Sequence, residues 1–299
     1  MRVQNGQGTH PDGPQPASIA TKHGTVEYAS LGDGPAVLSL HGAAGGYDQG
    51  LILARTIGGP GFRFLAVSRP GYFGTPLAVG PTPDAQADAV AALLDALDIR
   101  TAAVMAVSGG GPCALQFALR HPQRCWALVM VSACSAPLAS RPPLSFRLLP
   151  LIARSATLVR LMRARAARDL DRGQYRGITD PALRARTLGN PETGPLLREL
   201  TLGMFDRLAE RMAGTFNDIE QARLLPDFPF ERIAVPTLIV HGTRDPLVPF
   251  AQAQTLAGRI PSAEFLALQD AEHAVVFTHR NEIRRRVTAF LAAHTPRTA

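Results

Sequence analysis

Short runs of apolar residues recur along the 299-residue chain, and turn residues bound each of them. Runs of this kind are typical of strands that a sheet buries on both faces. The segment Ala20–Ser30 alternates loosely instead and ends at Gly32-Asp33-Gly34-Pro35, which predicts a hairpin or turn before the first buried strand. We expect the buried strands at Ala36–Leu40, Phe64–Ser68, Ala102–Val107, Ala127–Val131, Thr237–Val240 and Glu264–Leu268.

Helical patterns separate several of these runs. Alanine and leucine recur at helical spacing in Pro83–Leu97, and Pro112–Arg120 and Glu282–Ala293 have similar patterns. Strands that alternate with helices predict an α/β fold with a mostly parallel central sheet and helices on both faces. In such sheets the ligand chemistry gathers at the carboxyl ends of the strands.

The alternation of strands and helices stops in the middle of the chain. Two segments rich in leucine and arginine, Phe146–Arg168 and Pro195–Ala213, have helical patterns there, and no clear strand lies between them. We interpret this stretch as a helical lid inserted into an α/β core. The predicted division is a flexible tail at 1–19, a core of 20–135 and 231–299, and the lid at 136–230.

The first part of the predicted lid is rich in arginine before its first acidic residue, Asp169. One interpretation is a solvated helix face opposite a leucine face that packs on the core. The other is a basic amphipathic helix that attracts a membrane surface or an anionic substrate. The arginines are Arg141, Arg147, Arg154, Arg160, Arg163, Arg165 and Arg168.

The composition is that of a globular protein, with 46% hydrophobic and 18% charged residues. The formal net charge of +7 comes almost wholly from arginine, because Lys22 is the only lysine. Since no lysine- or arginine-dense motif with interleaved aromatic residues is present, we expect no nucleic-acid partner.

The N-terminal sequence and the cysteine spacing bear on the location of the protein and on the state of its thiols. Residues 1–18 lack the apolar stretch of a secretory signal, and no apolar run is long enough to cross a bilayer, so we expect a cytoplasmic location. The cysteines are odd in number and have no paired spacing, which predicts buried free thiols rather than disulfides or a zinc site. They are Cys113, Cys125 and Cys134.

A serine among small residues carries the most specific chemistry. In Ala102–Pro112 an apolar strand runs into Ser108, and a helical pattern follows. A sharp strand-to-helix turn of this kind presents a nucleophilic serine above the sheet, at the positive end of a helix. The residues two before and two after it must be small, as Ala106 and Gly110 are. A phosphate-binding turn is the alternative, but the Gly-Lys-Ser/Thr ending of such turns is missing.

Further motifs accompany this serine turn along the chain. They are His41–Gly46, Ser68–Gly74, His121–Arg124 with Trp126–Ser132, His241–Pro249 and Asp270–His273. Together with the turn at Ser108, these motifs resemble in kind and order those of the α/β-hydrolase superfamily. The resemblance extends from about Ala20 to His294 and implies the fold of that family.

The resemblance also implies an oxyanion hole. The backbone N–H groups of Ala43, in the first glycine-rich loop, and of Gly109, just after the nucleophile, would bind the developing negative charge. The chain departs from the family pattern at Ala106, where glycine is usual, and at Ala271-Glu272, where a pair of small residues commonly precedes the histidine.

A serine nucleophile needs a histidine to accept its proton, because the hydroxyl is weakly nucleophilic at neutral pH. His273 follows a late strand, and Asp245 follows another strand end, so its carboxylate can fix the tautomer of the histidine. The order serine, aspartate, histidine is that of this fold. Asp270 and Glu272 remain alternatives for the acid, although residues so near in sequence rarely reach the far ring nitrogen.

Other polar residues near these motifs have structural interpretations. We expect His41 to brace the oxyanion loop and His279 to begin the last helix. Tyr47 and Asp48 follow the glycine-rich loop, and we expect them to be solvated rather than to contact substrate.

The sequence thus predicts a serine hydrolase that cleaves a small carboxylic ester through an acyl-enzyme, with a small-molecule substrate and without a metal or organic cofactor. The same residues leave open C–C bond hydrolysis, peptidase, perhydrolase and acyltransferase reactions. A ligand receptor on this fold with little turnover is an alternative of another class. The oligomeric state is not encoded in these motifs.

Overall fold

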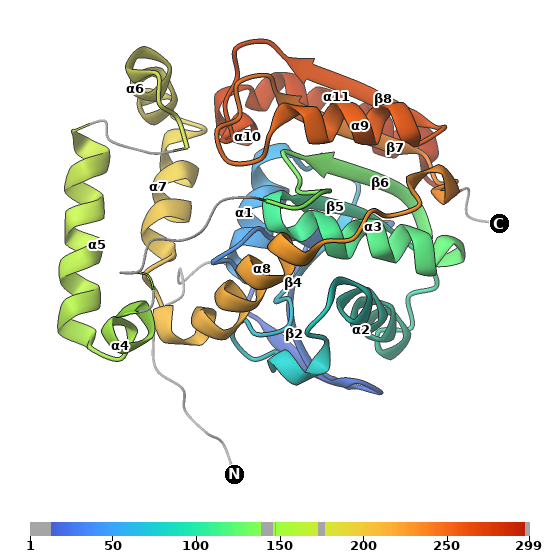
Figure 1. The fold of residues 1–299 in the computed structure, drawn as a ribbon, viewed down its shortest axis with the longest axis horizontal. Coiled ribbons are helices and arrows are strands. Elements are labelled where there is room, and N and C mark those ends of the chain that lie inside the picture. The colour runs from blue at the N-terminus through green and yellow to red at the C-terminus, as the bar shows by residue number, and fades with distance from the viewer. Residues whose placement is uncertain (1–12, 139–145, 147, 173–176, 297–299) are drawn as a thin grey trace.

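The computed structural model describes residues 13–138, 146, 148–172 and 177–296. These residues contain an eight-stranded sheet with the strand order β1-β2-β4-β3-β5-β6-β7-β8 (Figure 1). β2 pairs antiparallel with β1 and β4, and the other neighbours are parallel. The strands are β1 (Ala17–Thr21), β2 (Gly24–Leu31), β3 (Ala36–Leu40), β4 (Arg63–Val67), β5 (Ala102–Val107), β6 (Cys125–Val131), β7 (Thr237–Gly242) and β8 (Ala263–Leu268).

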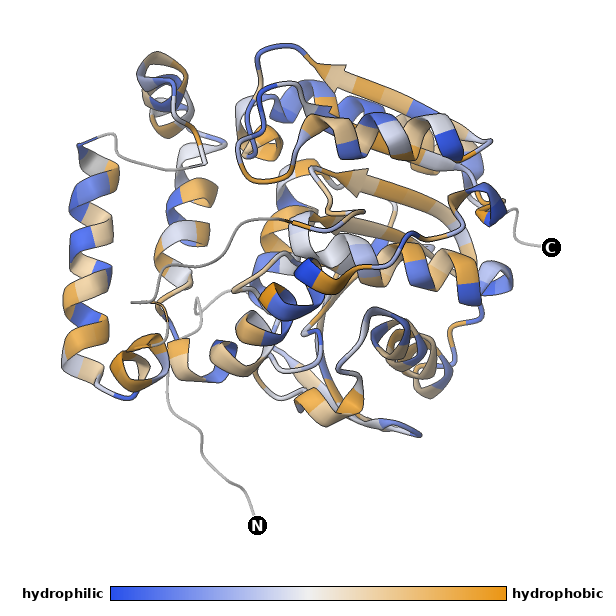
Figure 2. Ribbon diagram, in the orientation of Figure 1, coloured by the Kyte–Doolittle hydropathy of each residue, from blue (hydrophilic) through white to orange (hydrophobic). Residues whose placement is uncertain are grey.

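The predicted fold class is confirmed, and each apolar run named above forms a strand. Successive strand residues point to opposite faces, so each buried strand feeds two cores. In β5, Val104 joins the core beneath α2, α3 and α9, whereas Met105 joins the core beneath α1 and α11. Figure 2 accordingly shows apolar strands between helices of mixed hydropathy. The helices are α1 (Tyr47–Ile57), α2 (Pro83–Ala96), α3 (Gly111–Arg120), α9 (Phe250–Arg259), α10 (Val275–Thr278) and α11 (Arg280–His294).

Between β6 and β7 the described residues form helices, and we call residues 148–224 of this stretch the helical insertion. Figure 1 shows these helices beside the sheet, with α5 on the outside and α8 near the centre. They are α4 (Leu149–Ala153), α5 (Ala156–Asp171), α6 (Pro181–Gly189), α7 (Gly194–Gly203), the 3₁₀ turn η5 (Leu208–Arg211) and α8 (Met212–Leu224).

The described residues of the two segments with helical patterns form helices, but neither segment is one continuous helix. The first is divided between α4 and α5 where Ser155 becomes an N-cap, its side chain accepting a hydrogen bond from the Leu158 N–H. The second is divided between α7 and η5, where Arg207 has a left-handed φ of 53°. Residues 1–12 of the predicted tail and the arginines Arg141 and Arg147 lie outside the described residues.

The outer helix α5 also differs from the expected leucine face on the core. Leu158 and Leu161 are 45% and 59% exposed, because α5 packs against α7 and α4 rather than on the sheet. Leu158 and Leu161 therefore share the solvent-facing surface with arginines such as Arg165, which pairs with Asp169 at 3.6 Å, whereas Leu170 of the same helix is buried.

Candidate active site

Ser108 lies at the junction between β5 and α3, in a one-turn 3₁₀ helix, Ser108–Gly110. Its φ is 50°, a left-handed conformation that is uncommon and costly for a residue with a side chain. The elbow is packed closely, because a Cβ on Gly110 would lie 2.7 Å from the His41 carbonyl oxygen. A Cβ on Gly111 would lie 2.4 Å from the Cys134 carbonyl oxygen, so this turn requires glycine after the serine.

The structure brings the three predicted catalytic residues, Ser108, His273 and Asp245, together at the carboxyl ends of β5, β8 and β7; we call this hydrogen-bonded set the relay. Ser108 Oγ lies 3.2 Å from His273 Nε2, and His273 Nδ1 lies 2.8 Å from Asp245 Oδ2. The Leu247 and Val248 N–H groups donate to Asp245 Oδ1, both at 2.9 Å. With Nδ1–H donating to the carboxylate, His273 Nε2 is left to accept the serine proton.

Asp245 is held as an anion by its surroundings. Burial alone would raise the pKa of this carboxyl, but hydrogen bonds from His241, His273 and the Val248 N–H, together with the electrostatic effect of His273, outweigh burial and hold the pKa well below its usual value. The second imidazole belongs to His241, which is almost fully buried and has Nε2 3.2 Å from Asp245 Oδ2. His241 Nε2 also donates to the Val248 carbonyl at 3.0 Å. His241 lies within the sequence motif His241–Pro249, but residue type and position alone predict no role for it.

The other candidate acids lie elsewhere. Asp270 is exposed and pairs with Arg244 at 2.8 Å. Glu272 is buried and faces the helical insertion, where it accepts hydrogen bonds from the Thr179 N–H and hydroxyl and from the Asp180 N–H. Glu272 therefore ties the loop that carries the candidate base to the insertion, through a contact with Thr179, 93 positions away, that no local sequence pattern reveals.

The two predicted oxyanion donors lie side by side. A Cβ on Gly109 would be 3.1 Å from the Ala43 nitrogen, and a Cβ on Gly42 would be 3.2 Å from the Ser108 Cβ. Among the described residues, no hydrogen bond engages the Ala43 N–H. Both backbone donors are thus next to the serine, where the oxygen of a tetrahedral intermediate would develop its charge.

His41 braces this loop, as expected. Its Nδ1 donates to the Gly42 carbonyl at 2.6 Å, and its Nε2 accepts the Arg69 N–H at 3.0 Å. Burial and the neighbouring Arg69 guanidinium lower the pKa of His41 well below its usual value, so the imidazole stays neutral. A neutral ring is needed because Nε2 acts as an acceptor.

The interpretation of Tyr47 as a solvated residue is wrong, whereas Asp48 is partly exposed. Tyr47 is buried at the start of α1, and its N–H donates to Ser68 Oγ at 3.1 Å. Asp48 pairs with Arg211 of the helical insertion at 2.5 Å. The ion pair joins residues 163 positions apart, a separation that no local pattern reveals.

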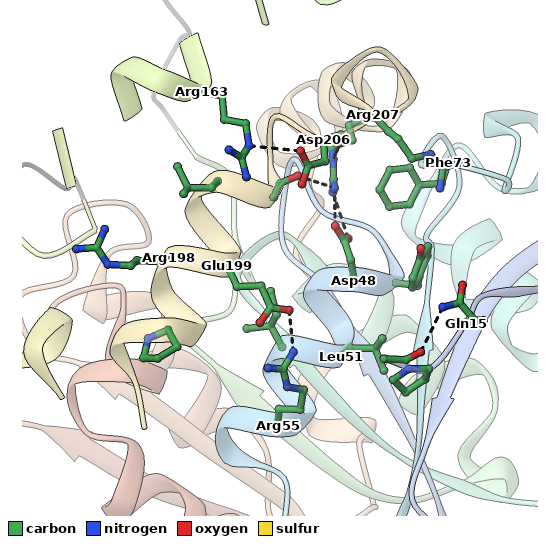
Figure 3. Close-up of a pocket in the computed structure, with 18 residues that line it drawn as sticks. Gln15, Asp48, Leu51, Arg55, Phe73, Arg163, Arg198, Glu199, Asp206 and Arg207 are labelled. Carbon is green, nitrogen blue, oxygen red and sulfur yellow. Dashed lines mark hydrogen bonds and ion pairs between the residues drawn. The ribbon is translucent and has the colours of Figure 1, made fainter. Parts of the chain in front are cut away.

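A cavity of about 510 Å³ lies between α1 and the helical insertion (Figure 3). Its lining includes Leu51 from α1 and several charged side chains, but not the serine or histidine of the relay. The charges face one another: Arg55 pairs with Glu199 at 2.7 Å, and Arg163 with Asp206 at 3.5 Å. This cavity is therefore separate from the Ser108–His273 pair.

The cysteines are free and buried, as predicted. Burial raises the pKa of Cys113 and Cys125 to about 12 and that of Cys134 to about 11. Within the described residues, no cluster of histidine, cysteine or carboxylate side chains could hold a metal ion. The described helices include none that is both long and apolar enough to span a membrane.

The fold and the serine turn define a class of protein, and comparison with known proteins identifies it. Residues 35–280 match the model of the alpha/beta hydrolase fold family. The chain belongs to this family, which confirms the resemblance inferred from its motifs.

Three relatives illustrate the range of the family. An alpha/beta hydrolase fold protein from Nakamurella multipartita is 33% identical, with a TM-score of 0.80 and coverage of 93% of this chain and 99% of that one. A 2-hydroxy-6-oxononadienedioate/2-hydroxy-6-oxononatrienedioate hydrolase from Paraburkholderia xenovorans is 27% identical over 89% of this chain and 90% of its own. A pimeloyl-[acyl-carrier protein] methyl ester esterase from Chromobacterium violaceum is 28% identical over 88% and 96%.

Proposed function

We propose that the protein is a serine hydrolase that cleaves small carboxylic esters through an acyl-enzyme intermediate. The observation that carries this proposal is the continuous relay in which His273 lies 3.2 Å from Ser108 Oγ and 2.8 Å from Asp245. A nucleophilic serine needs a base within hydrogen-bond reach, and the base needs an acid that orients it. The strained φ of Ser108 supports the same role, because strained backbone clusters at functional turns.

The mechanism follows from these positions. Ser108 Oγ attacks the ester carbonyl while His273 Nε2 takes its proton, and Asp245 stabilises the imidazolium that forms. The N–H groups of Ala43 and Gly109 bind the oxyanion. His273 then gives its proton to the departing alkoxide, and a water molecule, deprotonated by His273, hydrolyses the acyl-enzyme. None of these steps is assigned to a metal or an organic cofactor.

We further propose that the helical insertion is a lid over this site. Support comes from its contacts with both loops that flank the serine. Glu272, beside His273, holds Thr179 of the insertion, and Arg211 of the insertion holds the loop that contains Ala43. On this proposal the chain divides into a lid at 136–230 and a core of 20–135 and 231–299, and the substrate is a small molecule bound between them.

The second candidate reaction is hydrolysis of a C–C bond by the same residues. It is favoured by one specific finding, the similarity to the 2-hydroxy-6-oxononadienedioate/2-hydroxy-6-oxononatrienedioate hydrolase. The ester reaction is favoured by the similarity to the methyl ester esterase. Peptidase, perhydrolase and acyltransferase reactions and a slow-turnover receptor remain outcomes of the test below.

The test is hydrolysis of p-nitrophenyl esters from acetate to palmitate by wild type and Ser108→Ala, with fluorophosphonate labelling in parallel. We expect wild type to cleave the shorter esters and Ser108→Ala to lose that activity while keeping its unfolding temperature. Labelling at Ser108 without turnover of any ester would replace the ester assignment with a narrower substrate, such as a C–C substrate. If the protein is not labelled and cleaves no ester, the hydrolase assignment is refuted and the receptor is favoured.

A further inference from the structure

A buried arginine of the helical insertion holds one side of the loop that contains Ala43. Arg211 is 1% exposed. Its Nη1 donates to the Gly45 carbonyl at 2.8 Å and, more weakly, to the Ala44 carbonyl at 3.4 Å. Its Nη2 donates to Asp48 at 2.5 Å and to the Gly203 carbonyl at 2.9 Å. One guanidinium thus joins the end of α7 to the two peptide groups that follow Ala43.

A second buried arginine, from the core, holds the other side of the same loop. Arg69 donates from Nε to the His41 carbonyl at 3.1 Å and from Nη2 to the Gly42 carbonyl at 3.2 Å. Its guanidinium is fixed by Asp218 of α8 through two hydrogen bonds of 2.8 and 2.5 Å. The Asp218 carboxylate is buried, so the helical insertion supplies the counter-ion that orients Arg69.

A tyrosine completes the arrangement. The Tyr72 hydroxyl donates to Asp218 Oδ2 at 2.6 Å and accepts the Ala44 N–H at 3.2 Å. Burial, together with the Asp218 charge, raises the pKa of Tyr72 well above its usual value, so the hydroxyl keeps the proton that it donates.

The peptide groups on both sides of Ala43 are therefore engaged, while its own N–H is not engaged by any described residue. The carbonyls of residues 41, 42, 44 and 45 accept hydrogen bonds from the two arginines, and the N–H of residue 44 donates to the tyrosine. A loop fixed through its neighbouring peptides in this way holds the Ala43 N–H in one direction. That donor is the one assigned to the oxyanion hole.

We propose that Arg211 and Asp218 are positioning residues of the oxyanion hole, through which the helical insertion holds the Ala43 N–H in place. The proposal rests on the proposed serine-hydrolase function. It adds that the insertion takes part in the geometry of the reaction as well as covering the site. Arg211 acts directly on the loop carbonyls, and Asp218 acts through Arg69 and Tyr72.

The experiment compares Arg211→Gln, Asp218→Asn and the nearly isosteric Tyr72→Phe with wild type. The control is Arg163→Gln, which also removes a lid arginine paired with an aspartate, at 3.5 Å, but from a half-exposed position. kcat and KM are measured with p-nitrophenyl acetate. Affinity is measured for an aryl trifluoromethyl ketone, whose adduct with Ser108 places an oxyanion in the hole. Active sites are counted by fluorophosphonate titration, so that any unfolded fraction is removed from kcat.

We expect Arg211→Gln and Asp218→Asn to lower kcat per titrated site by about 10- to 100-fold, with KM within about threefold of wild type. Removal of an oxyanion donor costs about 10²- to 10³-fold and a displacement of about 1 Å about 10²-fold, so a loosened donor belongs near this range. The ketone should lose affinity by the same factor as kcat/KM. Tyr72→Phe should show a smaller loss of the same kind, about three- to tenfold, and Arg163→Gln should stay within about twofold.

A purely structural role predicts another result. The variants would then have fewer titratable sites and a lower unfolding temperature, but kcat per site and ketone affinity would match wild type, which would overturn the proposal. If Arg211→Gln does not fold, the same comparison is decided by Tyr72→Phe. If wild type labels with fluorophosphonate but cleaves no ester, the labelling rate replaces kcat, since the phosphonyl oxygen uses the same hole. A wild type that neither labels nor cleaves would refute both this proposal and the proposed function.

Discussion

Replacement of Asp245 by asparagine tests the relay most sharply. Oδ1 accepts two backbone N–H groups, at Leu247 and Val248, so the amide oxygen of asparagine would keep that side. The amide NH₂ would then face His273 Nδ1 and His241 Nε2, where Oδ2 now lies at 2.8 and 3.2 Å. Because an NH₂ group can only donate, His273 would have to present Nδ1 as an acceptor and carry its proton on Nε2.

That tautomer cannot accept the serine proton. The same tautomer error in a serine protease lowers kcat by about 10⁴, so we expect Asp245→Asn to lose about 10⁴ in kcat, or about 5.4 kcal/mol of transition-state stabilisation. The buried His241 N–H would also lose one of its two acceptors and keep the Val248 carbonyl, so we expect the free energy of unfolding to fall by about 1 kcal/mol. The assay is p-nitrophenyl acetate hydrolysis per folded molecule, with thermal unfolding in parallel. The matched control is Asp270→Asn, an exposed site where we expect kcat to stay within about twofold.

The result that would refute this reasoning is an Asp245→Asn enzyme with kcat within about tenfold of wild type. His273 would then be oriented by another group, and Glu272→Gln would become the next variant to measure. A similar loss in Asp270→Asn would show instead that the assay reports a general disturbance of the histidine loop.

Three further predictions concern packing and protonation. Gly110→Ala should lower the free energy of unfolding by about 1–3 kcal/mol, since the added Cβ would lie 2.7 Å from a backbone oxygen. Gly258→Ala in α9 should raise the free energy of unfolding by about 1 kcal/mol, because open space surrounds the added Cβ. Urea titration measures both changes. The three cysteines are buried, and their pKa values are raised to about 11 or 12, so they should not react with a disulfide reagent at pH 8 in the native protein. All three should react in denaturant. Rapid labelling of the native protein would contradict their burial. The pKa of His41 is lowered in the folded state, so below about pH 6.5 the unfolded chain binds a proton that the folded chain does not. The free energy of unfolding therefore decreases as the pH falls below that value, by at most about 1.4 kcal/mol per pH unit. Between pH 7.5 and 5.5 the unfolding temperature should fall less steeply in His41→Gln than in wild type.

The strands were predictable from sequence because their residues are apolar whatever the distant context. A fully buried strand such as β3 needs apolar side chains on both faces, and that requirement is visible in all of its residues except Ser39, whose hydroxyl donates to the Gly50 carbonyl at 2.8 Å. Helix α1 was missed because it begins after Gly46 without a side-chain cap and contains an internal glycine, Gly50. That glycine serves tertiary packing, since a Cβ there would lie 2.9 Å from the Ala66 Cβ of β4.

The candidate site was predictable to the extent that its residues follow strand ends. Ser108, Asp245 and His273 each follow a strand, and parallel strands bring their carboxyl ends to one edge of the sheet. The roles of His241 and Glu272 depend on which way a side chain turns from its loop, which residue type alone does not fix. The break at Arg207 was hidden for a similar reason, because no glycine or proline marks its left-handed φ.

The loop at residues 41–46 connects the helical insertion to the proposed active site. Residues 41–46 lie between β3 and α1, so neither the sheet nor the helix supplies partners for all of their backbone groups. Buried carbonyls need donors, and a guanidinium offers five N–H groups in a fixed arrangement. Arg69 and Arg211 meet that need, but both are buried cations and require carboxylates, which Asp218 and Asp48 provide. Because Asp218 and Arg211 belong to the helical insertion, we expect substitutions in the insertion to be tolerated at exposed positions such as Leu161, but not at these two.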